Sequence, residues 1–113
     1  MPKYLLLMYN EKMEMPTNPT PEQIENGIKP WRDYISPGTE KGSFVSANPV
    51  LWEGKMLTEK GIEDYKPQKI DLGGYMIITA KDMNEAIKIA KQSPHSIMKS
   101  GPTTIRKIEE VLI

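Results

Sequence analysis

The sequence predicts an α+β domain in which two helices cover one face of a four-stranded antiparallel sheet. Two unbroken apolar runs indicate central strands, and two capped segments with helical periodicity indicate helices. The elements follow one another in the order β–α–β–β–α–β, which is the ferredoxin-like arrangement. The length of 113 residues fits a single domain spanning residues 1–113.

Four segments are expected to form the strands. The first, Tyr4–Tyr9, is apolar without alternation, and a polar loop over Asn10–Pro19 follows it. We expect Ser43–Thr58 to be one irregular strand that is bulged at Pro49, with a loop or hairpin over Glu59–Pro67 after it. The other two strands are expected within Lys69–Ala80, where Gly73-Gly74 permits a bend or a close backbone approach, and within Thr103–Ile113, as a strand with a tail.

The two helices have recognisable start and stop signals. Thr20 with Gln23 forms a capping box, and an apolar stripe follows at helical spacing over Ile24, Ile28, Trp31 and Ile35. Pro30 should kink or briefly break this helix, and Pro37-Gly38 and Gly42 should end it. Asp82 and Glu85 start the second helix, and Ser93-Pro94 stops it.

Composition argues against several classes of function. Lys plus Arg and Asp plus Glu each total 15, so the chain lacks the basic surface that nucleic-acid binding needs. It has no cysteine and one histidine, so we expect no disulfide, no metal site and no cofactor. The apolar start is too short for a membrane span or a signal-peptide core, which suggests a cytoplasmic protein without a membrane partner.

The sheet predicts a partner. Neighbours such as Leu6 and Leu7, or Ile77 and Ile78, must point to opposite faces of a strand, so both faces of the sheet are apolar. Because two helices cover one face only, we expect a homodimer packed through the other face. The alternative is that the long loops fold over this face instead.

The ordered set of motifs resembles the YCII-related (DGPF-domain) family. Its second half is similar to Gly73–Ile78 followed by Asp82, Glu85-Ala86-Ile87, Ala90 and Ser93-Pro94-His95. Its first half is similar to Lys3–Leu7, Trp31–Tyr34, Gly42–Phe44 and Gly54–Leu57. The resemblance covers nearly the whole chain and implies a dimeric α+β barrel with a cleft between sheet, first helix and partner.

The chain departs from this family at three points. Ile62–Tyr65 stands where the Asp-Gly-Pro-Phe motif is expected, and Ser93 replaces a cysteine. No histidine lies near the start of the chain, so the His–Asp pair of some members is not carried over. The family includes a dehydrochlorinase-like enzyme, but most members have no assigned reaction.

Five residues are candidates for a site. His95 can act as a general acid or base, and Asp71 as a base, although a histidine after a helix can simply face its dipole. Tyr34, Asp64 and Tyr65 are candidate ligand-binding residues near the cleft, although loop carboxylates are commonly solvated.

Three functions remain open. The first is a homodimer that binds a small organic ligand in its cleft. The second is a lyase or dehydrochlorinase, which requires His95 and Asp71 to converge within about 10 Å, because a base must reach its proton directly or through one water. The third is a structural or partner-binding dimer without a pocket, since one fold hosts many functions.

Overall fold

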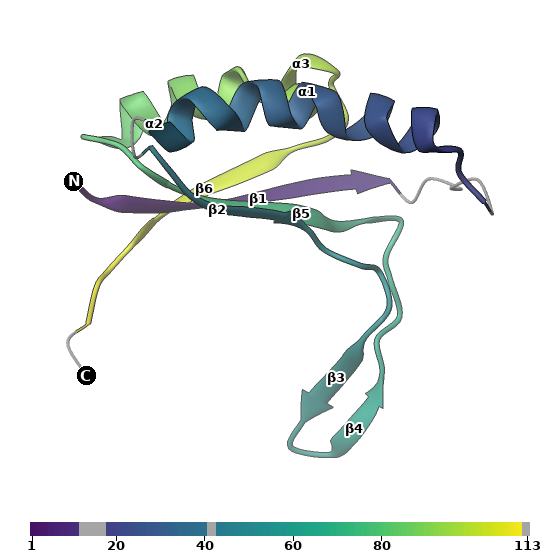
Figure 1. The fold of residues 1–113 in the computed structure, drawn as a ribbon. Helices are drawn as coiled ribbons and strands as arrows, with labels where there is room; N and C mark the ends of the chain where they lie inside the picture. Colours follow the sequence, from purple (N-terminus) through teal and green to yellow (C-terminus); the bar gives the residue numbers. More distant parts are fainter. Residues whose placement is uncertain (12–17, 41–42, 112–113) are drawn as a thin grey trace.

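A computed structural model describes residues 1–11, 18–40 and 43–111. Four strands form an antiparallel sheet in the order β2-β5-β1-β6: β1 (Lys3–Glu11), β2 (Phe44–Pro49), β5 (Ile70–Thr79) and β6 (Thr103–Ile108). The helices α1 (Pro21–Glu40), α2 (Met83–Lys91) and α3 (Pro94–Ile97) all lie on one side of this sheet (Figure 1). This α+β architecture is consistent with the predicted ferredoxin-like fold, and the two apolar runs are its central strands.

The core lies between the sheet and the helices. Leu6 on β1 pairs with Met76 on β5, and both side chains are fully buried, as is Ile78 one step along the same face. Ala86 and Ala90 of α2 complete the buried cluster from the helix side. Strand neighbours alternate in direction, so Leu5, Leu7 and Ile77 lie on the opposite, helix-free face and are only half-buried.

Both helix starts are confirmed. The Thr20 backbone N–H donates to Gln23 Oε1 at 2.9 Å, and the Gln23 N–H donates back to Thr20 Oγ1 at 3.1 Å. At α2, the Glu85 N–H donates to Asp82 Oδ1 at 2.9 Å, while the Glu85 side chain accepts from Lys81 N at 3.2 Å. These bonds satisfy donors that the first turn of a helix leaves without partners.

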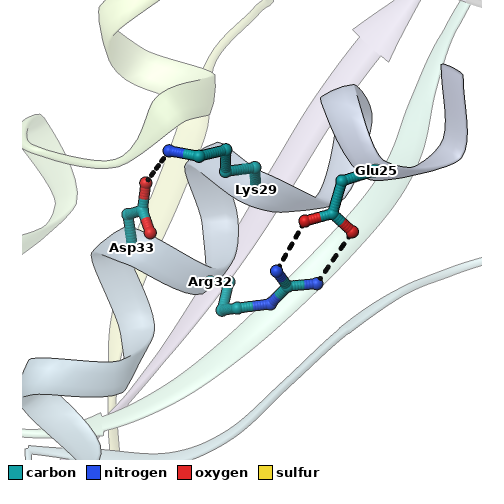
Figure 2. Close-up of polar contacts among 4 residues, drawn as sticks. All are labelled: Glu25, Lys29, Arg32 and Asp33. Carbon is teal, nitrogen blue, oxygen red and sulfur yellow. Dashed lines mark hydrogen bonds and ion pairs between the residues drawn. The ribbon is translucent and has the colours of Figure 1, made fainter. Parts of the chain in front are cut away.

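Of the kink or brief break predicted at Pro30, the break is wrong, because α1 continues through Pro30 to Glu40. The predicted end at Pro37-Gly38 is wrong for the same reason. Two ion pairs on the solvent side of α1 join residues before and after Pro30 (Figure 2). Lys29 Nζ lies 3.0 Å from Asp33 Oδ2, and both terminal nitrogens of Arg32 donate to the Glu25 carboxylate. The Arg32 guanidinium lowers the pKa of Glu25 through a hydrogen bond and its charge. Pro30 has no N–H and cannot make the backbone hydrogen bond of a helix, and these side-chain contacts lie on either side of that gap.

The predicted stripe of α1 packs along only part of its length. Trp31 packs against the core, whereas Ile24 and Ile28 are 48% and 47% exposed. The predicted turn at Gly42 lies outside the described residues, as do positions 12–17 of the loop predicted over Asn10–Pro19 and the last two residues of the predicted tail.

The expectation of one strand over Ser43–Thr58 is wrong. The strand β2 ends at Pro49, which has no N–H to continue the ladder, and its irregularity lies between Phe44 and Ser46 instead of at the proline. The segments β3 (Lys55–Thr58) and β4 (Gly61–Asp64) form a separate two-stranded sheet. This hairpin extends away from the helices on the other side of the main sheet (Figure 1), and all eight of its residues are exposed.

Close backbone approach is confirmed at Gly73. A Cβ there would lie 1.8 Å from Asn10 Oδ1, so any side chain at position 73 would displace the asparagine. The pairing of β1 with β5 also shifts between Met8 and Tyr9, opposite this glycine. The bend places Asp71 beside Asn10 at the end of β1, where the chain from the hairpin enters the sheet.

Candidate functional site

Asp71 and Tyr65 meet where the hairpin returns to the sheet. The Tyr65 hydroxyl donates to Asp71 Oδ2, which also accepts from Gln68 N at 3.0 Å, while Oδ1 accepts from Leu72 N at 2.7 Å. The tyrosine hydrogen bond, followed by the two backbone bonds, lowers the pKa of Asp71. The same bond raises the pKa of Tyr65. A carboxylate held in this way fastens the turn before β5 and is a weaker base than a free aspartate.

Asp64 and Tyr65 line a hollow at the base of the hairpin, together with Glu53, Gly54 and Lys55. Asp64 forms an ion pair with Lys55 across the two strands, and both side chains are largely exposed. The Tyr65 N–H donates to Gly54 O at 2.9 Å, which extends the pairing of the hairpin toward its base. This hollow therefore offers one positive and two negative side chains beside a phenol.

Tyr34 belongs to α1, on the other side of the sheet, and its side chain contacts β2 and α2. Its hydroxyl donates to Ile89 O at 2.5 Å, and its ring makes edge contacts with Trp31 and Phe44 at centroid distances of 6.2 and 5.0 Å. Burial raises the pKa of Tyr34, so the phenol stays neutral at ordinary pH. A second hollow adjoins this ring, lined also by Pro37, Ser43 and Gln92. The contacts of Tyr34 join the first two helices to the sheet.

His95 lies in the short helix α3, which the sequence analysis did not predict. Ser93 caps this helix by accepting from the Ser96 N–H at 3.2 Å, and His95 itself is 7% exposed. Its Nε2 lies 3.3 Å from Pro102 O, and this carbonyl also accepts from Tyr9 N at 3.0 Å. Within the described part of the chain, the imidazole therefore contacts a backbone carbonyl instead of a carboxylate.

The candidate residues divide into two groups. Asp64, Tyr65 and Asp71 gather at the base of the hairpin, while Tyr34 and His95 belong to the helix layer (Figure 1). Among the described residues, no hydrogen bond or ion pair joins His95 to Asp71, and each has other partners. The pair proposed for acid–base chemistry does not form a hydrogen-bonded dyad in the single chain.

A cluster of three polar side chains on the helix-free face was not predicted from the sequence. Ser46 Oγ lies 2.8 Å from the Tyr75 hydroxyl oxygen, and Asn48 Nδ2 donates to the same oxygen at 3.2 Å. We call Ser46, Asn48 and Tyr75 the polar trio. A signal was present, because Ser46 and Asn48 alternate with less polar residues along a strand and therefore share a face. The predicted bulge at Pro49 concealed this alternation.

The antiparallel sheet with helices on one face defines an α+β protein and is consistent with a ferredoxin-like fold. No family model matches the chain, and no curated protein matches it. Within the described residues, no helix has both the length and the apolar character needed to cross a membrane.

Among solved structures, the chain is similar to 5-chloro-2-hydroxyhydroquinone dehydrochlorinase (TftG) from Burkholderia phenoliruptrix AC1100, solved in complex with 2,5-dihydroxybenzoquinone. The two share 14% sequence identity, and the match has a TM-score of 0.57. It covers 96% of this chain and 95% of that chain. At this identity the likeness establishes the fold, which hosts ligand binding and catalysis in the neighbour.

Proposed function

We propose that this protein is a YCII-like homodimer that binds a small, planar, oxygen-bearing organic molecule in a cleft at the subunit contact. The observation that carries the proposal is the likeness, over nearly the full length of both chains, to a protein solved with a dihydroxyquinone. The resemblance of the sequence motifs to the YCII-related family also supports the proposal.

The helix-free face supports the dimer. Leu5, Leu7 and Ile77 lie there on adjacent central strands, on the side that no helix covers (Figure 1). Apolar surface of this kind favours burial by about 25 cal/mol per Å². A second copy packed around a two-fold axis would bury the same strip from each chain.

The hairpin of β3 and β4 also supports a second copy of the chain as the partner. An isolated two-stranded hairpin is only marginally stable in water, and this one leaves Leu57 76% and Ile62 71% exposed. These two residues are register partners, so they share one face of the hairpin. Because the hairpin extends on the helix-free side (Figure 1), a subunit resting against the sheet would lie within its reach.

The enzymatic alternative is a lyase or dehydrochlorinase with His95 and Asp71 as acid and base. The similar solved structure is that of a dehydrochlorinase, which favours this alternative. The contacts of the two side chains favour it less, because both oxygens of Asp71 already accept hydrogen bonds that hold a turn. Binding without assigned chemistry is therefore the function that we put forward.

The dimer is tested by light scattering coupled to gel filtration. We expect wild type to elute at about twice the 12.9 kDa of one chain. Ile77→Glu, which places a charge on the helix-free face, should yield a monomer. Ile97→Glu makes the same chemical change on α3, where the side chain is already 68% exposed, and should remain a dimer. A monomeric wild type at 0.1 mM would contradict the proposal.

Ligand binding is tested by thermal shift and calorimetry with 2,5-dihydroxybenzoquinone, 2,5-dihydroxybenzoate and catechol. At a ligand concentration of 100 Kd, linkage stabilises the folded state by about 2.7 kcal/mol. For a chain of this size, that raises Tm by roughly 10 °C. Ile77→Glu should lose the shift and Ile97→Glu should keep it. No saturable shift with any of the three probes would refute the proposed function.

A further inference from the structure

The polar trio is a hydrogen-bonded cluster of side chains on the helix-free face of the main sheet. Asn48 on β2 lies opposite Tyr75 on β5, and Ser46 lies opposite Ile77 on the same face. Met76, next to Tyr75 in the chain, is fully buried under the helices, which places Tyr75 on the opposite side. Two polar side chains of β2, Ser46 and Asn48, thus converge on the phenolic oxygen of Tyr75 on the neighbouring strand β5.

The trio does not use up its own hydrogen-bonding capacity. The Tyr75 hydroxyl accepts from Asn48 and shares one hydrogen bond with Ser46, in which either oxygen can be the donor. In both cases one hydroxyl hydrogen of the Ser46–Tyr75 pair remains available. Asn48 also keeps its second N–H and its Oδ1, neither of which bonds to a described residue. The trio therefore presents two donors and one acceptor at closely spaced positions.

The register places an apolar floor beside these groups. Leu7 is the cross-strand partner of Tyr75, and Leu5 is the partner of Ile77. The trio thus lies at the β2 side of the sheet, and the strip of Leu5, Leu7 and Ile77 continues from it toward the centre. A flat ring resting on this strip would direct its substituents at one edge toward the trio.

We propose that Ser46, Asn48 and Tyr75 form the polar end of the ligand site and bind neighbouring hydroxyl and carbonyl oxygens of a planar ring that rests on Leu7 and Ile77. A carbonyl oxygen accepts from the available hydroxyl and the Asn48 N–H, and a ring hydroxyl donates to Asn48 Oδ1. The ligand class is therefore a hydroxyquinone or hydroxybenzoate. This inference rests on the proposed function, because it names the site at which that ligand binds.

The electrostatics of Tyr75 agree with this role. The hydrogen bond with Ser46 first, and then the one with Asn48, lower the pKa of Tyr75, whereas the pKa values of Tyr34 and Tyr65 are raised. A more acidic phenol is a stronger hydrogen-bond donor to an acceptor oxygen. Of these three tyrosines, Tyr75 is thus the one best prepared to donate to a ligand.

The experiment measures the Kd for 2,5-dihydroxybenzoquinone by calorimetry on wild type, Tyr75→Phe, Asn48→Ala and Ser46→Ala. Tyr75→Phe keeps the ring and removes the oxygen on which the trio converges. We expect it to weaken binding about tenfold, with Asn48→Ala close to it and Ser46→Ala at about threefold. The matched control is Thr104→Val, which removes a hydroxyl opposite Leu7 on the far edge strand and should bind as wild type does.

Gel filtration of each variant separates the outcomes. If wild type binds and Tyr75→Phe binds equally well, the inference is overturned while the proposed function stands. If Tyr75→Phe becomes monomeric and loses binding for that reason, the trio holds the two subunits together instead of binding the ligand, and the inference also fails. If wild type binds none of the probes, the proposed function itself fails. A dimeric Tyr75→Phe with weakened binding supports the inference.

Discussion

Removing one oxygen atom from Tyr34 should measurably loosen the contact between α1 and α2. In Tyr34→Phe the ring keeps its edge contacts with Trp31 and Phe44, and only the hydrogen bond from the hydroxyl to Ile89 O is lost. The Ile89 carbonyl still accepts a hydrogen bond from Gln92 N at 3.2 Å, so the substitution leaves this acceptor with a partner. The substitution therefore isolates a single hydrogen bond between two helices.

The magnitude follows from this geometry. A net intramolecular hydrogen bond contributes about 0.5–1.5 kcal/mol, and the shared carbonyl argues for the middle of that range, about 1 kcal/mol. For a chain of this size, that lowers Tm by roughly 4 °C. Tyr34→Ala, which also removes the ring between Trp31 and Phe44, should cost about 3 kcal/mol.

The assay is urea unfolding followed by circular dichroism, with Tyr9→Phe as the control. The Tyr9 hydroxyl bonds to no residue in the described ranges, so that variant should stay within about 0.5 kcal/mol of wild type. A Tyr34→Phe midpoint equal to that of wild type, beside a strongly destabilised Tyr34→Ala, would refute the hydrogen-bond argument and leave only the ring contacts.

Alkaline pH provides a second measurement on the same residue. Because the folded state raises the pKa of Tyr34 above its ordinary value of 10.0, the folded chain retains a proton that the unfolded chain releases. The stability that this contributes is present below pH 10 and is lost as the pH rises further. Wild type should therefore lose stability above pH 10 more steeply than Tyr34→Phe does.

Four further substitutions should change stability. Gly27→Ala should stabilise the folded state by about 0.5–1 kcal/mol in thermal melts, because the helix interior disfavours glycine and the new Cβ meets nothing within 4 Å. Gly101→Ala should instead lower Tm, since φ at this position is +156° and the new Cβ would lie 2.0 Å from Tyr9 O. Leu6→Ala, at a fully buried position, should cost about 2–5 kcal/mol in urea unfolding, and a loss below 1 kcal/mol would contradict the assigned core. Asp71→Asn should make stability fall less steeply as the pH is lowered into the acid range. The lowered pKa of Asp71 contributes stability that is present above the ordinary value of 3.8 and is lost as the pH falls below it. An unchanged acid part of the curve would argue against the role of Asp71 in holding the turn.

The sequence predicted the central part of the fold because local chemistry and tertiary packing agree there. In the unbroken apolar runs around Leu6 and Met76, every second side chain is buried under the helices, and both runs became central strands. The caps at Thr20 and Asp82 were equally readable, since each is completed within three residues. Where one local rule acted alone, as at Pro30, the prediction failed, because the helix continues through the proline.

The site was harder to predict because it depends on contacts between distant segments. Asp71 was identified as a possible base, but its role in fastening a turn depends on Tyr65 and on two backbone N–H groups that only the folded chain brings together. Ser46 and Tyr75 are 29 residues apart and form a cluster only through the pairing of β2 with β5. The convergence of His95 with Asp71 in a dimer stays a prediction.

The exposed hairpin implies two tiers of stability in one chain. Amide protons of the central strands should exchange with solvent only when the whole domain unfolds, whereas those of β3 and β4 bury little and should exchange through local opening. Hydrogen exchange at rising protein concentration then becomes a reporter of association. Protection that grows selectively in residues 55–64 would locate the contact on the hairpin, and the concentration at half-protection would measure how tightly two chains hold each other.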